Sequence, residues 1–247
     1  MPRAPRIAPP GYCYHVLNRA ALRARIFHDF EDYAHFQRLL ERTKRVVPIR
    51  LYAFCVMPNH WHLVVEPLAA EGLSRFIHRL ASSHALQWRS VYGTAGQGAV
   101  YQGRFKAFPI QTDRHYLTVV RYVEQNPLRA GLVRSCREWR WSSFWWRTRP
   151  GEGARLLDNS PVPLPDDWCD TIDAPDAAPD IDELRQSIRR CAPFGDSEWQ
   201  QKAATAVGQT SALRSRGRSA SRGADHDIVD STAVLNPAAS GGDCAQL

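Results

Sequence analysis

Lysine is rare in this sequence of 247 residues, and its cysteines are never closely paired. Only three of the 32 basic residues are lysine. Nearly all of the positive charge therefore lies on guanidinium groups, whose planar forks match phosphate oxygens and stack on bases. The six cysteines are scattered and form no C-x-x-C pair. This spacing argues against a disulfide framework and a zinc knuckle, and it favours reduced cysteines in a cytoplasmic protein.

Long apolar runs are absent as well. No stretch reaches the roughly 18 uncharged apolar residues of a transmembrane helix, so none is expected. Residues 1–6 are basic, but no apolar segment follows them, which argues against a secretory signal. A hydrophobic content of 44% is ordinary for a globular protein, and the length allows one good-sized core plus an appendage.

Acidic residues are scarce in the N-terminal part of the chain only. Residues 1–149 contain 23 Lys and Arg against 9 Asp and Glu, a net charge of +14. Residues 150–247 contain 9 against 16, a net charge of −7. GC-rich codon usage would favour Arg over Lys, but it does not explain an excess of bases over acids in one part alone. The basic N-terminal domain therefore indicates a nucleic-acid partner.

The most informative segment is MPNHWHLVVEP, residues 57–67, in which two histidines flank one tryptophan. The run LVV that follows favours a strand, and residues two apart on a strand face the same way. His60 and His62 would then present two imidazoles to one metal ion, while Trp61 packs on the other face. The alternative is a pair of half-buried, hydrogen-bonded histidines, and the triplet alone does not decide between the two.

The remaining pattern predicts an α+β fold. Helices are expected at 30–46, 73–92 and 113–126, and strands at 12–17, 49–56, 60–65 and within 100–110. The short turn before His60 predicts a hairpin. The order strand–helix–strand–strand–helix–strand–helix predicts an antiparallel sheet with helices packed on it, in a split βαβ, ferredoxin-like arrangement.

The third expected helix carries a tyrosine and an asparagine on one face. Thr112 or Asp113 can cap its start, and Pro127 follows its end. Tyr122 and Asn126 are four residues apart and lie beside the core-facing stripe, so the Tyr122 hydroxyl is expected to be exposed. Taken alone, Tyr122 would be a packing residue and Asn126 a residue that satisfies the helix end. Together with the two histidines they indicate a site.

The C-terminal part is expected to be less ordered. The tryptophan-rich segment 138–146 closes the first domain, by core packing in preference to base stacking. We expect that domain to span 10–149, and a Pro- and Asp-rich linker to follow at 150–180. A small helical, basic extension is expected at 181–218 and a disordered tail at 219–247.

Several segments together resemble the REP-associated tyrosine transposases, which are single-tyrosine HUH transposases. They are YHVLNR at 14–19, MPNHWHL at 57–63, QGRFK at 102–106, RYVEQNPLRAGLV at 121–133 and WSS at 141–143. The second and fourth in this order are a highly specific pair. The resemblance covers about 10–147 well and 181–218 weakly. Trp61 replaces a smaller apolar residue more usual there, at a position that requires only an apolar side chain.

The resemblance implies a metal-dependent single-strand DNA endonuclease and strand transferase of the HUH fold. It assigns His60, His62 and Asn126 as ligands of a divalent metal, Mg²⁺ or Mn²⁺. It assigns Tyr122 as the nucleophile that forms a covalent 5′-phosphotyrosine. The implied substrate is single-stranded DNA with an imperfect hairpin and a short recognition tetranucleotide, and the implied protein is cytoplasmic, nucleoid-associated, and a monomer or a homodimer.

Contacts to the DNA backbone are expected from Arg19, Arg104, Lys106 and Arg129, each of which could equally be a solvated surface charge. The basic cluster at 214–218 would add contacts to the hairpin. Two other readings stay open. One is a domesticated DNA-binding protein that no longer cuts. The other is an HUH relaxase or replication initiator, against which the short chain and the Asn-Pro motif argue.

Overall fold

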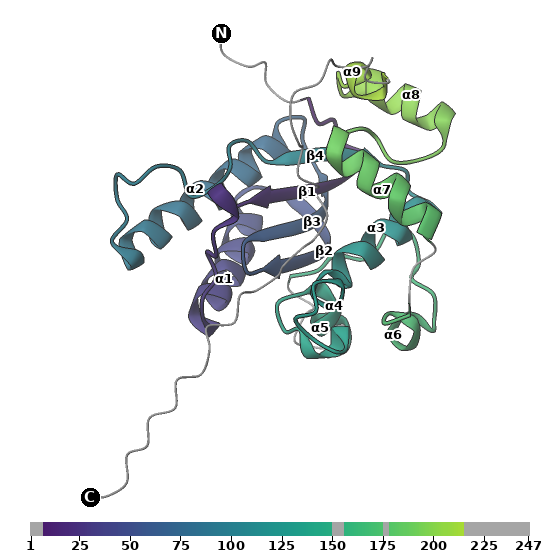
Figure 1. The fold of residues 1–247 in the computed structure, drawn as a ribbon. Coiled ribbons are helices and arrows are strands. Elements are labelled where there is room, and N and C mark those ends of the chain that lie inside the picture. Colours follow the sequence, from purple (N-terminus) through teal and green to yellow (C-terminus); the bar gives the residue numbers. More distant parts are fainter. Residues whose placement is uncertain (1–6, 150–155, 175–177, 215–247) are drawn as a thin grey trace, which may run out of the picture.

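A four-stranded antiparallel sheet lies at the centre of the computed structural model, which describes residues 7–149, 156–174 and 178–214. The strands are ordered β2-β3-β1-β4 across the sheet (Figure 1). Their bounds are Cys13–Arg19 for β1, Ile49–Met57 for β2, His60–Pro67 for β3 and Lys106–Ile110 for β4. This order, with one helix in each crossover, is the split βαβ arrangement, so the predicted α+β fold class is confirmed.

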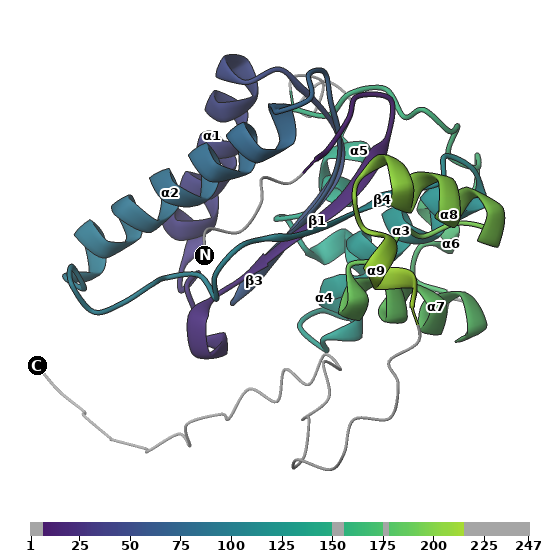
Figure 2. The ribbon, with the colours of Figure 1, turned by 90° about the horizontal axis from the view of Figure 1, so that it is seen from above.

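Helices cover both faces of this sheet. On one face lie α1 (Phe30–Val46) and α2 (Gly72–Tyr92), and on the other lies α3 (Arg114–Glu124), as Figure 2 shows. Side chains alternate along a strand, so each strand contributes to two cores. Trp61 packs in the core beside α1 and α2, and Val64 packs in the core beside α3. Trp61 therefore faces away from the two histidines that flank it, as predicted.

β2 and β3 form the predicted hairpin, which is joined by a two-residue turn at 58–59. On its other edge β3 pairs with β1, which places Leu17 opposite His62 and Arg19 opposite His60. A one-residue slip would turn every side chain of β3 to the wrong face, so pairing on both edges fixes the register strongly. The two histidines are thus held by the interior of the sheet.

The third helix ends earlier than predicted. α3 begins after Asp113, whose carboxylate accepts a hydrogen bond from the His115 backbone N–H at 2.8 Å, so Asp113 is the cap. It ends at Glu124, and a separate four-residue helix follows as α4 (Asn126–Arg129). Pro127 has no N–H with which to continue the α3 hydrogen-bond pattern, which explains the break.

The fourth strand is shorter than the extended region predicted within 100–110. β4 begins only at Lys106, while Tyr101 makes an isolated antiparallel bridge with Ala20. Between them Gly103 has a φ of +102°, which a strand does not accommodate. The chain therefore bends here and brings Arg104 beside the end of β1.

The described part of the predicted linker, residues 156–174, packs against the first domain. Trp168 of α6 (Trp168–Thr171) is buried and donates from its indole nitrogen to a Glu124 carboxylate oxygen at 3.0 Å. Arg147 of α5 (Ser143–Arg147) binds the other oxygen at 2.8 Å. A buried carboxylate with an ion pair and an indole donor is well satisfied, so this stretch is part of the fold and not a spacer.

The tryptophan-rich segment before α5 packs as predicted. Trp141 stacks on Tyr33 of α1 with 5.0 Å between ring centroids. The indole nitrogen of Trp139 donates to the Val56 carbonyl at 3.0 Å. Both rings therefore pack against the core of the first domain.

The C-terminal extension is attached to the edge of the sheet. Phe194 makes a parallel bridge with Ile110 of β4, which covers an otherwise open edge strand. Around this bridge lie three helices, α7 (Ala178–Arg190), α8 (Ser197–Ala206) and α9 (Thr210–Leu213). The predicted disordered tail and all of the basic cluster except Arg214 lie outside the described residues.

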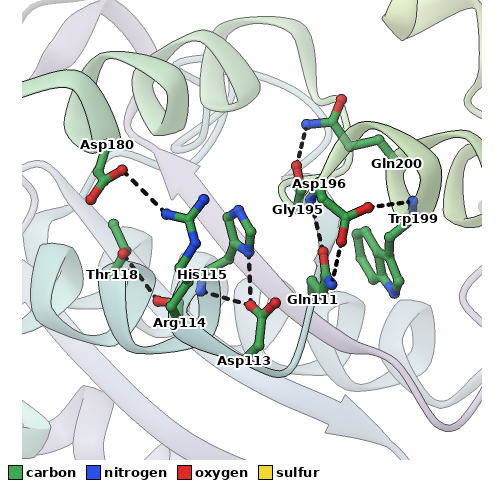
Figure 3. Close-up of polar contacts among 10 residues, drawn as sticks. All are labelled: Gln111, Asp113, Arg114, His115, Thr118, Asp180, Gly195, Asp196, Trp199 and Gln200. Atoms are coloured by element: carbon green, nitrogen blue, oxygen red, sulfur yellow. Dashed lines mark hydrogen bonds and ion pairs between the residues drawn. The ribbon is translucent and has the colours of Figure 1, made fainter.

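Figure 3 shows how the turn before α8 is held. The Gln111 amide donates to the Asp196 carboxylate at 2.7 Å and accepts from the Asp196 backbone N–H at 2.8 Å. The same carboxylate caps α8 by accepting from the Trp199 N–H at 2.9 Å. A Cβ on Gly195 would lie only 2.5 Å from the Gln111 oxygen, so the turn requires glycine at this position.

Among the described helices, none is long and apolar enough to span a bilayer.

Candidate active site

His60 and His62 lie side by side on β3. Their ring centroids are 5.0 Å apart, the rings are nearly perpendicular, and both side chains are buried. Each uses Nδ1 for a hydrogen bond, His60 with Asn59 Oδ1 at 2.6 Å and His62 with His15 Nε2 at 2.8 Å. The Nε2 atoms are therefore the nitrogens left for a ligand.

Nε2 of His60, Oδ1 of Asn126 and Nδ1 of His15 are buried and have no hydrogen-bond partner within the part of the chain that the structure describes. Asn126 is fully buried at the start of α4, and its amide nitrogen donates to the Tyr122 carbonyl at 3.4 Å. A buried polar atom without a partner costs about 1–3 kcal/mol. A cation bound at His60 Nε2 or at Asn126 Oδ1 would satisfy that atom.

The donors present fit a divalent metal. Two imidazole nitrogens and one amide oxygen leave coordination positions open for water and phosphate. Within residues 7–149, 156–174 and 178–214 there is no group of three or more His, Cys, Asp or Glu placed to hold a metal. Asn126, the third ligand predicted from the sequence, is not one of these residue types.

Tyr122 of α3 packs against His62 and His15. Its ring is edge-on to His62, with 6.1 Å between centroids, and edge-on to His15 at 6.3 Å. The Arg129 guanidinium lies 4.0 Å above the same ring and donates to the Tyr122 carbonyl. The residue as a whole is buried, with 6% of its surface accessible, and it lines the cavity described below, so the predicted exposure of its hydroxyl stays a prediction. Packing against β3 and the cover from α4 bury this shoulder of the helix.

A cavity of about 320 Å³ opens in front of His62 and Tyr122. The described residues that line it include five cationic side chains and no acidic one: Arg19, Arg23, Arg104, Lys106 and Arg185. Three of the four cations predicted to contact DNA are therefore at the cavity. The fourth, Arg129, covers Tyr122 and is not among the described lining residues.

Residues 10–126 match the family described as "Transposase IS200 like". This chain belongs, through these residues, to the IS200-like transposase family. The matched range contains His60, His62, Tyr122 and Asn126, and it ends at the first residue of α4. The helices α5 to α9 of this IS200-like transposase lie beyond it.

A relative in Haemophilus influenzae bears the name of a REP-associated tyrosine transposase. It is 23% identical over 122 residues, which cover 46% of this chain and 69% of the relative. A solved structure of a REP-associated tyrosine transposase bound to a REP hairpin has a TM-score of 0.50 at 19% identity. That match covers 67% of this chain and 99% of the other, and it supports the fold. A Deinococcus radiodurans structure described as a transposase matches at a TM-score of 0.35 and 18% identity, over 51% of this chain and 97% of its own.

Two residues at or beside this site, His15 and Arg185, were not predicted from the sequence. His15 belongs to the YHVLNR segment, and strand alternation puts it on the same face as Leu17 and Arg19, but no motif marks it as a site residue. Arg185 lies on α7, and Lys106 donates from Nζ to the Ile188 carbonyl of that helix at 3.4 Å. No local pattern connects α7 to Tyr122, so this wall of the cavity could not be predicted.

The histidines at the site are held in the neutral form. Burial lowers the pKa of His60 to about 3, and the positive charge of Arg19 adds to the effect. Burial lowers the pKa of His15 to about 3 and that of His62 well below its ordinary value. Near neutral pH each ring therefore keeps one nitrogen with a lone pair, as a metal ligand must.

Acid is expected to destabilise the metal-free fold over a range that starts near pH 6.5. Below that pH the histidines of the unfolded chain bind protons, whereas His15, His60, His62 and His84 stay neutral because burial lowers each pKa, to about 4 in the last case. The unfolding free energy should then fall with pH, by up to about 1.4 kcal/mol per pH unit for each histidine. Urea unfolding in EDTA, between about pH 7.5 and 5.5, measures this slope.

Two variants show whether the buried rings cause that slope. His84→Gln removes one buried titrating ring from the core beside α2 and should reduce the slope by about one proton. His78→Gln removes an exposed histidine of the same helix and should leave the slope unchanged. A wild-type stability that is flat from about pH 7.5 to 5.5 would contradict the neutral, buried state of these rings.

Proposed function

We propose that this chain is a metal-dependent single-strand DNA endonuclease and strand transferase that acts on hairpin DNA. The observation that carries the proposal is the Tyr122 ring, held edge-on against His62 at a basic cavity. Membership of the IS200-like transposases supports it, as does the fold shared with a REP-associated tyrosine transposase. A single helix tyrosine is ordinarily a packing residue. A contact with His62 and a cavity shared with five cations support a role for Tyr122 in phosphodiester chemistry.

Three side chains would hold the divalent metal, Mg²⁺ or Mn²⁺. They are His60 and His62 through Nε2, and Asn126 through Oδ1, the atoms that the other hydrogen bonds leave available. When bound, the ion supplies positive charge to the nonbridging oxygens of the scissile phosphate. The histidine Nδ1 contacts keep the two rings oriented for this task.

Tyr122 would be the nucleophile. Its phenol oxygen forms a bond to the scissile phosphorus while the bond from phosphorus to the 3′ oxygen breaks. The phenol gives up its proton and the leaving oxygen takes one up, so the upstream fragment ends in a free 3′-OH. The downstream fragment stays on the protein as a 5′-phosphotyrosine. The reverse attack of a 3′-OH then joins strands without an external energy source.

Arg129 would position the nucleophile. Its guanidinium lies over the Tyr122 ring, and its Nη1 donates to the Gln125 side-chain oxygen at 3.0 Å. The residue is thus fixed by α4, and its positive charge over the ring would favour the phenolate that forms when Tyr122 loses its proton. Because Tyr122 meets His62 of its own chain, the geometry favours attack within one subunit, without a tyrosine from a partner.

The cavity cations would bind the DNA backbone, and salt should reveal it. Replacing Arg104 or Lys106 with Ala is expected to weaken hairpin binding and to reduce the slope of log Kd against log salt by about one for each cation. Arg38→Ala is the matched control, because this exposed arginine of α1 pairs with Glu31 at 3.3 Å on the other face of the sheet. Unchanged slopes in both cavity variants would contradict backbone contacts at these positions.

The direct test is the covalent adduct. The full-length protein is incubated with Mn²⁺ and a hairpin oligonucleotide that carries a label at either end. A 3′ label should migrate with the protein on a denaturing gel, because the downstream strand carries the phosphotyrosine. A 5′ label should appear in a shortened free strand that ends in a 3′-OH. Binding of the hairpin without either product would contradict cleavage and favour the non-cutting DNA-binding protein.

A further inference from the structure

His15 is the buried neighbour of a proposed metal ligand, yet it does not line the cavity among the described residues. Its Nε2 lies 2.8 Å from His62 Nδ1, and the two rings stack within 9° of parallel at 5.0 Å. Phe108 packs edge-on against the same imidazole at 5.1 Å. His15 therefore occupies one fixed position, on the side of His62 away from the DNA-binding cavity.

The 2.8 Å contact requires that one of its two nitrogens carries the hydrogen. In one arrangement His62 donates from Nδ1 to His15, and its Nε2 keeps the lone pair that a metal needs. In the other, His15 donates from Nε2, and His62 carries its hydrogen on Nε2 and cannot bind a metal. The proton between the rings thus decides whether His62 can be a ligand.

We propose that His15 is a positioning residue, which accepts the Nδ1 hydrogen of His62 and thereby holds His62 in the tautomer that binds the metal through Nε2. The proposal rests on the metal site of the proposed function. Without an acceptor at this position, His62 would have to bury an Nδ1–H with no partner. It would instead keep its hydrogen on Nε2, where water in the cavity can accept it.

The partner of His60 makes the contrast clear. Asn59 offers a side-chain oxygen, which can only accept, so the amide as placed holds His60 with its hydrogen on Nδ1. His15 can either donate or accept, so the state of His62 is open to both arrangements. His15 Nδ1 has no partner among the described residues, so the accepting arrangement leaves a buried N–H on His15 and the donating arrangement leaves a buried lone pair. Metal binding at His62 therefore selects the arrangement in which His15 is the acceptor.

Metal affinity without DNA tests this role. Mn²⁺ titrations followed by electron paramagnetic resonance compare the wild type with His15→Leu and His15→Gln. Loss of an acceptor behind a histidine ligand typically weakens metal binding by about 10–100-fold, and this loss is expected for His15→Leu. His15→Gln keeps a carbonyl near the Nε2 position and should stay within a few-fold of the wild type. His84→Gln, in the other core, should leave Mn²⁺ affinity unchanged.

A spectroscopic readout separates positioning from packing. In ¹⁵N-histidine spectra of the Mg²⁺-saturated wild type, His62 should carry its hydrogen on Nδ1, and His15 Nε2 should carry none. A protonated His15 Nε2 in that state would overturn the proposal, even if His15→Leu fails to fold. A folded His15→Leu variant that binds Mn²⁺ as tightly as the wild type would also overturn the proposal. The proposed function would still stand in that case if the wild type cuts DNA. A wild type that binds no Mn²⁺ would overturn the metal site and this role together.

Discussion

Replacing Tyr122 with Phe is expected to abolish DNA cleavage and strand transfer while leaving hairpin binding intact. The substitution removes the one oxygen that would attack phosphorus and keeps the ring that contacts His62 and Arg129. Loss of a covalent nucleophile should lower the cleavage rate by at least about 10³-fold. The rate is measured on a labelled hairpin with Mn²⁺, and binding is measured with the same oligonucleotide in EDTA.

Tyr116→Phe is the matched control on the same helix. Tyr116 is also buried, but its hydroxyl accepts a hydrogen bond from Ser160 at 2.9 Å and lies outside the cavity lining. Its loss should cost about 1 kcal/mol of stability and leave the cleavage rate within a few-fold of wild type. A Tyr122→Phe variant that still forms a covalent adduct would show that another residue is the nucleophile.

This pair of variants also separates the competing functions. A domesticated DNA-binding protein would give equal binding for wild type and Tyr122→Phe and no cleavage for either. A relaxase or replication initiator would cleave, but those proteins place the tyrosine in other surroundings. Here Tyr122 lies in the range that matches the IS200-like transposases.

The fold was predictable where local pattern and tertiary packing agree. Alternation along 60–65 predicted that Trp61 would oppose the histidines, and both sheet faces turned out to be covered. The capping role of Asp113 follows from its position before an apolar stripe. Strand order required one more step, because the β1–β3 pairing joins segments that are more than 40 residues apart. The expected split βαβ, ferredoxin-like arrangement implies this pairing.

The rest depended on contacts between distant segments. Tyr122 lies beside the apolar stripe of α3, and it is buried because His62 of β3 and Arg129 of α4 pack against its ring. The predicted linker packs because Trp168 meets the carboxylate of Glu124, 44 residues earlier. α7 borders the cavity through Arg185, which lies outside the matched range. None of these pairings leaves a trace in local composition.

Removal of either histidine ligand should have an effect as large as loss of the tyrosine. His60→Ala or His62→Ala takes away one of only three proposed protein ligands, and the charge stabilisation lost is worth several kcal/mol, or at least about 10³-fold in rate. The thermal stabilisation by Mn²⁺, about 2.7 kcal/mol at a hundred times Kd, should vanish as well. Calorimetric scans with Mn²⁺ and with EDTA measure it without DNA. His78→Ala, which removes an exposed histidine of α2, should leave both the cleavage rate and the stabilisation by Mn²⁺ unchanged.

Mixing the inactive variants tests where the tyrosine comes from. If Tyr122 serves the histidines of its own chain, as the 6.1 Å contact with His62 favours, an equimolar mixture of Tyr122→Phe and His62→Ala should stay inactive. In each mixed dimer one subunit would lack the tyrosine hydroxyl and the other would lack His62, so neither subunit would have a complete site. Recovery of cleavage would mean that a tyrosine from one subunit completes the histidine pair of another, and it would place α3 of the active enzyme away from β3 of its own chain. Persistent activity of His62→Ala alone would instead remove this histidine from the chemistry.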